Sequence, residues 1–209
     1  MPEAVSRLLI PFLICFIAGS IPFAVLAMTG SGIDIRTVGS GNPGFNNVLR
    51  VSKGRAIIAL FGDMGKGILP VWYFYHLQHL GQGIETGWIL GFAAVLGHCY
   101  SPFLKFNGGK GIATSAGVML VLYPAWAAVV LVVFVVVRVT GSKMKWKEAG
   151  AIASIGSWIF FAVLILAVVG TRDAAYAGLM MLFLAWRHKK NFQNLFGAPS
   201  KPVSLASQR

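Results

Sequence analysis

Long runs of apolar residues without charge set the class of fold that this chain can adopt. The first extends from Leu8 to Met28 with no charged residue inside it. A helix needs about 20 mostly apolar residues to cross a bilayer, and similar runs recur along most of the chain. The sequence therefore predicts an all-α, polytopic integral membrane protein: one helical bundle over residues 1–209, with a flexible tail at about 197–209.

The composition excludes several classes of protein. Charged residues make up 11% of the chain and the mean hydropathy is +0.73. A soluble domain has about 25% charged residues, so a cytosolic enzyme, a disordered tail and a nucleic-acid-binding module are all excluded. The net charge of +12 then reflects loop topology and anionic headgroups. Cys15 and Cys99 lie in apolar runs and predict no disulfide framework.

About seven short transmembrane helices fit the apolar runs. Residues 112–139 are too long for an ordinary span and carry Pro124, which would cost a helix interior a hydrogen bond. We interpret them as two short helices that turn at Tyr123 and Pro124. The alternatives are one long span, or a re-entrant pair beside five or six full crossings. The other predicted spans cover residues 8–28, 56–77, 88–104, 149–169 and 174–186.

Positive charge is divided unevenly between the two sides of this topology. With seven spans, 16 of the 18 Lys and Arg residues fall on one side, and only Arg7 and Arg172 fall on the other. Excess positive charge marks the cytoplasmic side, so we expect an external N-terminus and a cytoplasmic C-terminus. A cleaved signal peptide is the alternative for the first run, although that run continues to Met28.

A loop rich in glycine and asparagine follows the first span. Its glycines and proline prevent a long helix and leave N–H groups that can bind an anion, and the guanidinium of Arg50 fits a phosphate. A turn-rich connecting loop is the plainer interpretation. The candidate site residues here are Gly39, Ser40, Gly41, Asn42, Gly44, Asn47 and Arg50.

Asp63 and Lys66 are ionisable residues inside an otherwise apolar run. Such groups are costly in a span and normally face a cavity or one another, and their spacing places both on one helical face. We expect Asp63 to support the site and Lys66 to help to bind a phosphate. An internal ion pair that only fixes packing is the alternative.

A second glycine-rich loop leads into a predicted helix at Ile112. A helix N-terminus presents N–H groups and partial positive charge to a phosphate, and Lys110 adds a full charge. The loop is not a Walker A motif, because Gly111 stands where that motif needs Ser or Thr. A basic loop on anionic lipid is the alternative. The candidate substrate-binding residues are Gly108, Gly109, Lys110 and Gly111.

Two histidines complete the candidate site. His188 and Asn191 follow the last predicted span and can share one helical face, although a basic end there is also typical of a positive-inside anchor. His98 lies inside a span, where we expect a supporting role. The sequence lacks a pair of intramembrane carboxylates, metal-ligand spacing and a G-x-S-x-G elbow. What remains suits a phosphate-bearing substrate at the lipid interface.

Four motifs occur in order beside the predicted spans: G-S-G-N-P-G-x-x-N-x-x-R at 39–50, D-x-x-K-G at 63–67, G-H-x-x-S-P-F-L-K-F-x-G-G-K-G-I-A-T at 97–114 and R-H-x-x-N at 187–191. Together they resemble the bacterial acyl-phosphate:glycerol-3-phosphate acyltransferase family, the PlsY family. The resemblance covers nearly the whole chain. It departs at Asn46, where members commonly have Thr, and at residues 192–198, where many have a structural Glu and this chain has no acid.

The resemblance implies transfer of a fatty acyl group from acyl phosphate to the 1-hydroxyl of glycerol 3-phosphate, giving lysophosphatidic acid and phosphate for phospholipid synthesis. It implies a multi-pass protein of the bacterial inner membrane with a cytoplasmic active site and no metal or other cofactor. The expected partners are acyl phosphate, glycerol 3-phosphate and membrane lipid, and we expect a monomer. It implies that the active site is lined by Ser40, Asn42, Arg50, Lys110, His188 and Asn191, with Ser40, His188 and Asn191 as the catalytic residues.

A small membrane transporter for an organic phosphate or anion is the competing hypothesis. A cationic pocket between short, broken helices is also how carriers bind anions. The small number of spans, the absence of visible repeats and the clustering of polar residues on one face favour the enzyme.

Overall fold

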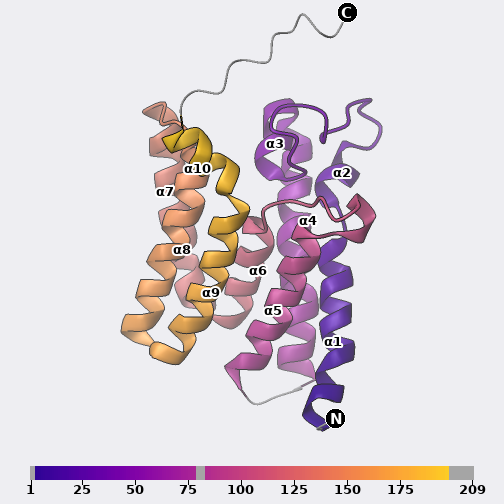
Figure 1. The fold of residues 1–209 in the computed structure, drawn as a ribbon, viewed down its shortest axis with the longest axis vertical. Coiled ribbons are helices and arrows are strands. Elements are labelled where there is room, and N and C mark those ends of the chain that lie inside the picture. The colour runs from indigo at the N-terminus through magenta and orange to yellow at the C-terminus, as the bar shows by residue number, and fades with distance from the viewer. Residues whose placement is uncertain (1–2, 79–82, 198–209) are drawn as a thin grey trace, which may run out of the picture.

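The structure is a computed structural model that describes residues 3–78 and 83–197, so the predicted tail lies almost entirely outside the described residues. Its regular elements are helices (Figure 1). In chain order they are α1 (Glu3–Ser20), α2 (Phe23–Met28), α3 (Phe45–Val51), α4 (Lys53–Trp72), a π-helical turn η1 (Tyr73–Leu77), α5 (Ile84–Cys99), a 3₁₀ turn η2 (Pro102–Leu104), α6 (Ile112–Leu122), α7 (Pro124–Lys143), α8 (Ala149–Val168), α9 (Thr171–Arg187) and α10 (Lys189–Phe196).

Five helical segments of the described chain are long and apolar enough to cross a membrane: Arg7–Met28, Lys53–Leu77, Ile84–Leu104, Pro124–Lys143 and Ala149–Val168. A sixth apolar helix, α6, is shorter. The expected all-helical membrane protein is therefore confirmed, with about five candidate spans. Two further helices are shorter: α6 has 11 residues, and α9 has 17 and carries Arg172 and Asp173 in its first turn.

The helix is interrupted at Tyr123, as predicted by the interpretation of residues 112–139 as two helices. Tyr123 has φ −142° and ψ 63°, outside the helical region, and Pro124 occupies the first turn of α7. Proline has no N–H and disfavours a helical conformation in the residue before it. The two helices contact one another on either side of the break.

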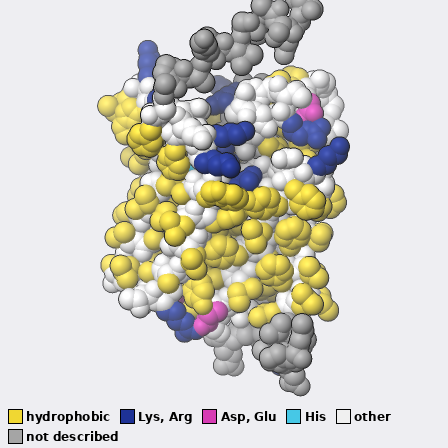
Figure 2. All heavy atoms as spheres, in the orientation of Figure 1, with side chains coloured by type: hydrophobic (Ala, Val, Ile, Leu, Met, Phe, Trp, Pro, Cys, Tyr) yellow, Lys and Arg dark blue, Asp and Glu magenta, His cyan; other side chains and the backbone are white. Residues whose placement is uncertain are grey.

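The bundle packs in pairs of neighbouring helices. Helix α1 lies against α5, α4 against α6, and α8 between α7 and α9. Large buried side chains, among them Trp88, Phe161 and Met180, fill the core, whereas valines such as Val132 and Val136 on α7 are exposed. Figure 2 shows hydrophobic side chains covering the middle of the visible face, with Lys and Arg gathered mainly toward its upper end. This banding is typical of a protein that faces lipid.

Small residues let α1 and α5 approach closely. A methyl group built on Gly97 would overlap the carbonyl oxygen of Phe16, and one on Gly19 would overlap that of Ala94. Ser101 Oγ donates a hydrogen bond to the carbonyl oxygen of Ser20 at 2.6 Å. Close backbone approach at small residues is a main source of helix association in membranes, and here it fixes the end of α5 from which the glycine-rich loop departs.

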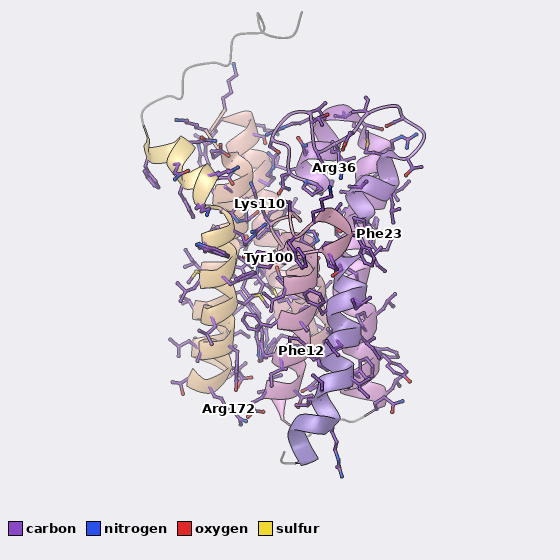
Figure 3. The ribbon with its side chains drawn as sticks, turned by 45° about the vertical axis from the view of Figure 1, so that its right-hand side comes forward. Phe12, Phe23, Arg36, Tyr100, Lys110 and Arg172 are labelled. Atoms are coloured by element: carbon purple, nitrogen blue, oxygen red, sulfur yellow. The ribbon has the colours of Figure 1, made fainter. Side chains whose placement is uncertain are left out.

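Contacts at the lower end of the bundle hold α5, the α6–α7 break and α9 together. Tyr123 donates a hydrogen bond to Asp173 at 2.5 Å and accepts one from Trp88 Nε1 at 3.2 Å. Arg172 forms an ion pair with Glu85. Figure 3 shows Arg172 at the end of the molecule opposite to Lys110.

Replacing Gly97 by alanine is expected to lower the stability of the protein by about 1–3 kcal/mol, because the added methyl group must displace the backbone of α1. The thermal unfolding midpoint in detergent measures this effect. Gly156→Ala on α8 is the matched control, because a methyl group there meets nothing within 4 Å. An unchanged midpoint for Gly97→Ala would contradict the close packing of α1 on α5.

Candidate active site

Loops and helix ends from three separate parts of the chain meet at the upper end of the bundle (Figure 1). They are the loop from α2 to α3, the loop between η2 and α6, and the junction of α9 with α10. Lys110 lies at this end in Figure 3. The fold therefore brings the motifs at residues 39–50, 97–114 and 187–191 to one end of the bundle, in agreement with the predicted clustering of polar residues on one face.

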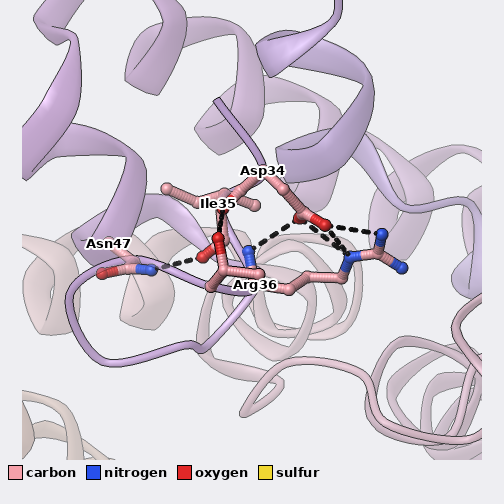
Figure 4. A network of polar contacts seen from close by, with 5 residues as sticks. Asp34, Ile35, Arg36 and Asn47 are labelled. Carbon is pink, nitrogen blue, oxygen red and sulfur yellow. Dashed lines mark hydrogen bonds and ion pairs between the residues drawn. The ribbon is translucent and has the colours of Figure 1, made fainter. Parts of the chain in front are cut away.

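Asn47 organises the first loop. Its side chain is buried, and its Nδ2 donates to the carbonyl oxygens of Ile35 and Val38, each at 2.9 Å (Figure 4). Its Oδ1 accepts a hydrogen bond from the amide of Ser40 at 3.0 Å. Both polar atoms of the Asn47 carboxamide therefore hold the loop, whereas the sequence predicted that this residue binds substrate.

The turn of this loop places Arg50 beside Gly39. Gly39 has φ 59°, and a methyl group there would overlap Asn47 Oδ1 and lie 3.6 Å from the Arg50 Nη1. Gly39 therefore lets the backbone pack closely on Asn47 and Arg50. Ser40 is exposed, and its hydroxyl accepts only a long contact of 3.4 Å from the amide of Asn42. The Ser40 hydroxyl is thus accessible, one residue after the glycine that packs beside Arg50.

Several amides of the two glycine-rich loops have backbone partners, which corrects the prediction that they are free to bind an anion. In the first loop, the amide of Gly41 donates to Val38 and that of Gly44 to Asn42, at 3.0 and 2.9 Å. In the second, the amides of Gly108 and Gly109 donate to the carbonyl oxygens of Cys99 and His98, each at 3.1 Å. Tertiary packing uses these donors, and the sequence pattern could not show it.

An exposed ion pair closes the outer part of the first loop. Arg36 donates to both carboxylate oxygens of Asp34, with Nη2 2.7 Å from Oδ2, and its amide donates to Oδ1 at 2.9 Å (Figure 4). These hydrogen bonds lower the pKa of Asp34 to about 2. The pair lies next to the carbonyl oxygen of Ile35 that Asn47 binds, so it restrains the same turn.

Arg187 fastens the second glycine-rich loop to the end of α5. Its Nη2 donates to the carbonyl oxygens of Gly109, Cys99 and Gly108, at 2.9, 3.3 and 3.4 Å. Its guanidinium lies 4.9 Å from the centre of the Tyr100 ring, a cation–π distance. A methyl group on Gly109 would overlap His98 Nε2, so the loop packs closely on α5. Sequence reasoning did not place Arg187 in the site, although it opens the fourth motif.

Gly111 ends this loop and starts α6. It has φ 88°, in the left-handed region that favours glycine. No side chain caps α6, and the first N–H groups of a helix have no partner within the helix. The first turn of α6 therefore retains the anion-binding character that the sequence predicted for the start of this helix.

Lys110 meets residues from several segments. Its Nζ lies 2.5 Å from Asn191 Oδ1 on α10. Burial lowers the pKa of Lys110 from 10.5, and the positive charges of Arg50, Arg187 and Lys190 lower it further. The negative charge of Glu148 acts in the opposite direction and raises this pKa. Lys110 thus lies within electrostatic reach of cations from α3, α9 and α10. The result is a strongly cationic site with one ammonium group held among other positive charges.

His188 lies at the junction between α9 and α10. Its side chain is 3% exposed, and Nδ1 lies 2.8 Å from the carbonyl oxygen of Leu184. Because a carbonyl can only accept, Nδ1 carries the proton and the neutral ring offers Nε2 as an acceptor. Burial lowers the pKa of His188 to about 4. The ring is therefore neutral at physiological pH.

Asp63, Lys66 and His98 form a buried polar cluster within the bundle. Lys66 Nζ lies 2.8 Å from Asp63 Oδ1 and donates to the carbonyl oxygen of Ile21 at 2.8 Å. His98 Nδ1 lies 3.5 Å from the same Asp63 oxygen. The predicted pairing of Asp63 with Lys66 is confirmed. The ammonium of Lys66 has partners inside the protein, which is the arrangement of a supporting group and not of an open phosphate contact.

Glu148 is a site residue that sequence reasoning missed. It lies in the turn before α8, where its carboxylate accepts hydrogen bonds from Asn191 and Asn194 of α10 at 2.6 and 2.8 Å. The only sequence signal was a single acid after a run of lysines, and its partners lie more than 40 positions away.

Among residues 3–78 and 83–197, no group of three or more His, Cys, Asp or Glu residues could hold a metal ion.

Comparisons with known proteins identify relatives of this chain. The sequence model of the glycerol-3-phosphate acyltransferase family matches residues 9–198. The chain is 37% identical to glycerol-3-phosphate acyltransferase 1 of Deinococcus radiodurans, over 90% of this chain and 91% of the relative. It is 36% identical to the glycerol-3-phosphate acyltransferase of Paraburkholderia xenovorans, over 90% and 86% of the two chains.

Two crystal structures of PlsY, an integral membrane glycerol 3-phosphate acyltransferase, share the fold. The glycerol 3-phosphate form has a TM-score of 0.75 at 29% identity and covers 92% of each chain. The lysophosphatidic acid form has a TM-score of 0.76 at 28% identity, over 90% of this chain and 91% of the other. The match of the family model over most of the sequence, together with these relatives, shows that the chain belongs to the glycerol-3-phosphate acyltransferase family.

Proposed function

We propose that this chain transfers a fatty acyl group from acyl phosphate to the 1-hydroxyl of glycerol 3-phosphate at the cytoplasmic face of a bacterial inner membrane. Family membership gives the coarser activity: the chain is a glycerol-3-phosphate acyltransferase that produces lysophosphatidic acid. The proposal adds the donor, the roles of the residues and the orientation. The observation that carries it is the meeting of Arg50, Lys110 and Asn191 from three segments around one cationic site.

In this proposal Lys110 and Arg50 bind the phosphate of glycerol 3-phosphate. The two cations lie within electrostatic reach of one another on different segments, and the N–H groups of the first turn of α6 add partial positive charge. A phosphate dianion is a stronger partner for the ammonium of Lys110 than the neutral oxygen of Asn191 that it contacts here. Substrate binding therefore replaces that contact, and the second N–H of the Asn191 carboxamide donates to the acyl phosphate.

Acyl phosphate is a mixed anhydride whose leaving group is already good, so positioning and charge supply much of the catalysis. The 1-hydroxyl oxygen attacks the acyl carbon, and the bond from that carbon to the bridging phosphate oxygen breaks. The electron pair leaves with phosphate, and the hydroxyl proton passes to a phosphate oxygen. We assign Ser40, Asn42 and Asn191 to the donor phosphate and the developing oxyanion. Neutral His188, which offers Nε2 as an acceptor, orients a hydroxyl.

The remaining predicted residues hold these groups in place. Gly39, Gly41, Gly44 and Asn47 shape the first loop. The second loop, which contains Gly108, Gly109 and Gly111, packs on His98, and His98 in turn lies beside the pair of Asp63 and Lys66. The proposed reaction needs no metal or other cofactor, since the acyl group is already activated by its phosphate leaving group. We propose that the protein acts as a monomer surrounded by membrane lipid.

The proposed orientation places α3, α10 and Lys110 on the cytoplasmic side. Figure 2 shows Lys and Arg mainly toward the upper end of the visible face, and excess positive charge is typical of the cytoplasmic side. If α6 and α9 cross beside the five longer spans, the number of crossings is seven and the N-terminus is external. Local thinning of the bilayer accommodates short spans at a modest cost.

Purified protein given palmitoyl phosphate is expected to release inorganic phosphate at a rate that depends on glycerol 3-phosphate, with lysophosphatidic acid appearing in equal amount. Both products are measured in one reaction. A Ser40→Ala variant with the same unfolding midpoint is the control for spontaneous hydrolysis and is expected to lose most of the turnover. Phosphate release without lysophosphatidic acid, or none from folded protein, would contradict the proposal and would direct attention to anion flux in liposomes.

Lys110→Ala is expected to raise the KM for glycerol 3-phosphate by about 10-fold to 100-fold, the rough effect of losing a charge-assisted contact of about 1.5–3 kcal/mol. Initial rates at saturating acyl phosphate measure the change. The KM for acyl phosphate serves as the internal comparison and is expected to change less. An unchanged KM for glycerol 3-phosphate in active, folded protein would remove Lys110 from the acceptor site.

The activity is expected to fall at alkaline pH because Lys110 must be protonated to bind phosphate. Burial lowers its pKa below 10.5, so kcat/KM for glycerol 3-phosphate declines as pH rises through that lowered value. Lys110→Arg keeps its charge over the whole range and is expected to remove this decline. His188, with a pKa of about 4, contributes no change between pH 6 and 8. The same alkaline decline in Lys110→Arg would exclude Lys110 as its source.

A further inference from the structure

Glu148 connects the turn between α7 and α8 with α10. It is the residue before α8, has φ 58°, and makes no side-chain cap on that helix. A residue other than glycine rarely adopts this left-handed conformation, which costs about 1 kcal/mol. A carboxylate at this position would ordinarily favour the positive end of its own helix. Here it turns to another helix, so tertiary contacts determine where it points.

Each oxygen of the Glu148 carboxylate accepts a hydrogen bond from the side-chain amide of a different asparagine of α10. Oε2 accepts from Asn191 Nδ2 at 2.6 Å, and Oε1 accepts from Asn194 Nδ2 at 2.8 Å. Asn191 and Asn194 are three positions apart and so lie on the same face of the helix. One side chain thus restrains a whole turn of α10.

These bonds fix which way the Asn191 carboxamide faces. Its NH₂ group is bound by the carboxylate, so its oxygen is directed at Lys110 Nζ, 2.5 Å away. The flipped orientation would place NH₂ against an ammonium and oxygen against a carboxylate, and both contacts would be repulsive. The negative charge of Glu148 therefore selects a single orientation of Asn191.

Glu148 also supplies a negative charge to this site, whereas the other acids with described side chains are paired elsewhere. Among the described side chains, Asp34 is paired with Arg36, Asp63 with Lys66, Glu85 with Arg172, and Asp173 with Tyr123. Burial raises the pKa of Glu148, but the hydrogen bonds from Asn194 and Asn191 and the charges of Lys110 and Arg50 outweigh burial and lower it. It therefore stays ionised beside Lys110.

We propose that Glu148 is a positioning residue for the acyl transfer, which orients Asn191 and holds α10 against the turn before α8. It touches no reacting atom and acts through Asn191. The inference rests on the proposed function, since it assigns Glu148 a task within that reaction. It predicts that the effect of Glu148 on turnover depends on the presence of the Asn191 side chain.

A double-mutant cycle in the palmitoyl phosphate assay tests this dependence. Glu148→Ala is expected to lower kcat by about 10-fold to 100-fold, the rough cost of misplacing an active-site group. The KM for glycerol 3-phosphate is expected to stay unchanged or fall, because the site loses an anion. In the Asn191→Ala background, Glu148→Ala is expected to change kcat less than about twofold, since residues that act together are not additive. Wild-type turnover in the same assay separates failure of this inference from failure of the proposed function.

Glu148→Gln separates hydrogen bonding from charge and is also the variant to use if Glu148→Ala does not fold. The glutamine oxygen can accept from one asparagine only, so kcat is expected between the wild-type and alanine values. Glu85→Gln at the other end of the bundle is the matched control, expected to keep wild-type kinetics. The inference is overturned if folded Glu148→Ala or Glu148→Gln keeps the wild-type kcat. It is also overturned if the effects of Glu148→Ala and Asn191→Ala multiply.

Discussion

The attachment of the second glycine-rich loop to the end of α5 is the contact on which the site depends. The loop contributes two amides to carbonyl oxygens of α5, and Arg187 of α9 binds carbonyl oxygens of both the loop and α5. These groups lie beside an apolar core, where an unpaired polar group would cost about 1–3 kcal/mol. Their mutual satisfaction therefore fixes the path of the backbone. That path determines where Lys110 lies and where α6 begins.

The placement of Lys110 among other cations suits the phosphate binding that we propose for this site. Arg50, Arg187 and Lys190 all act on the Lys110 ammonium, against a single nearby acid. These positive charges repel one another when no ligand is bound. The hydrogen bonds from Arg187 to the Gly109 carbonyl oxygen and from Lys110 to the Asn191 side-chain oxygen partly offset this repulsion. Anionic phosphates of the substrates would supply the missing charge. Both proposed substrates carry one, so binding them relieves a repulsion that the fold maintains.

The sequence predicted the features that depend on local rules and missed those that depend on tertiary partners. Pro124 in a long apolar run predicted the break at Tyr123, and the spacing of Asp63 and Lys66 predicted their pairing; both are seen. The hydrogen-bond partner of an amide or a carboxylate cannot be predicted from the neighbouring residues, because that partner can lie anywhere in the chain. For this reason the paired amides of Gly108 and Gly109, and the contacts of Glu148, were not predictable.

The scarcity of acids in this chain constrains its chemistry as well as its packing. The chain has six Asp and Glu residues, and five have described side chains. Each of the five is bound to a partner on its own or another segment: Arg36, Lys66, Arg172, Tyr123, or the asparagines of α10. None of these five carboxylates is therefore free to accept the proton of an attacking hydroxyl. His188 is a neutral acceptor but a weak base, with a pKa of about 4, so in the proposed reaction a phosphate oxygen of the substrates accepts that proton. Catalysis by positioning within a cationic site then follows from how the fold uses its few acids.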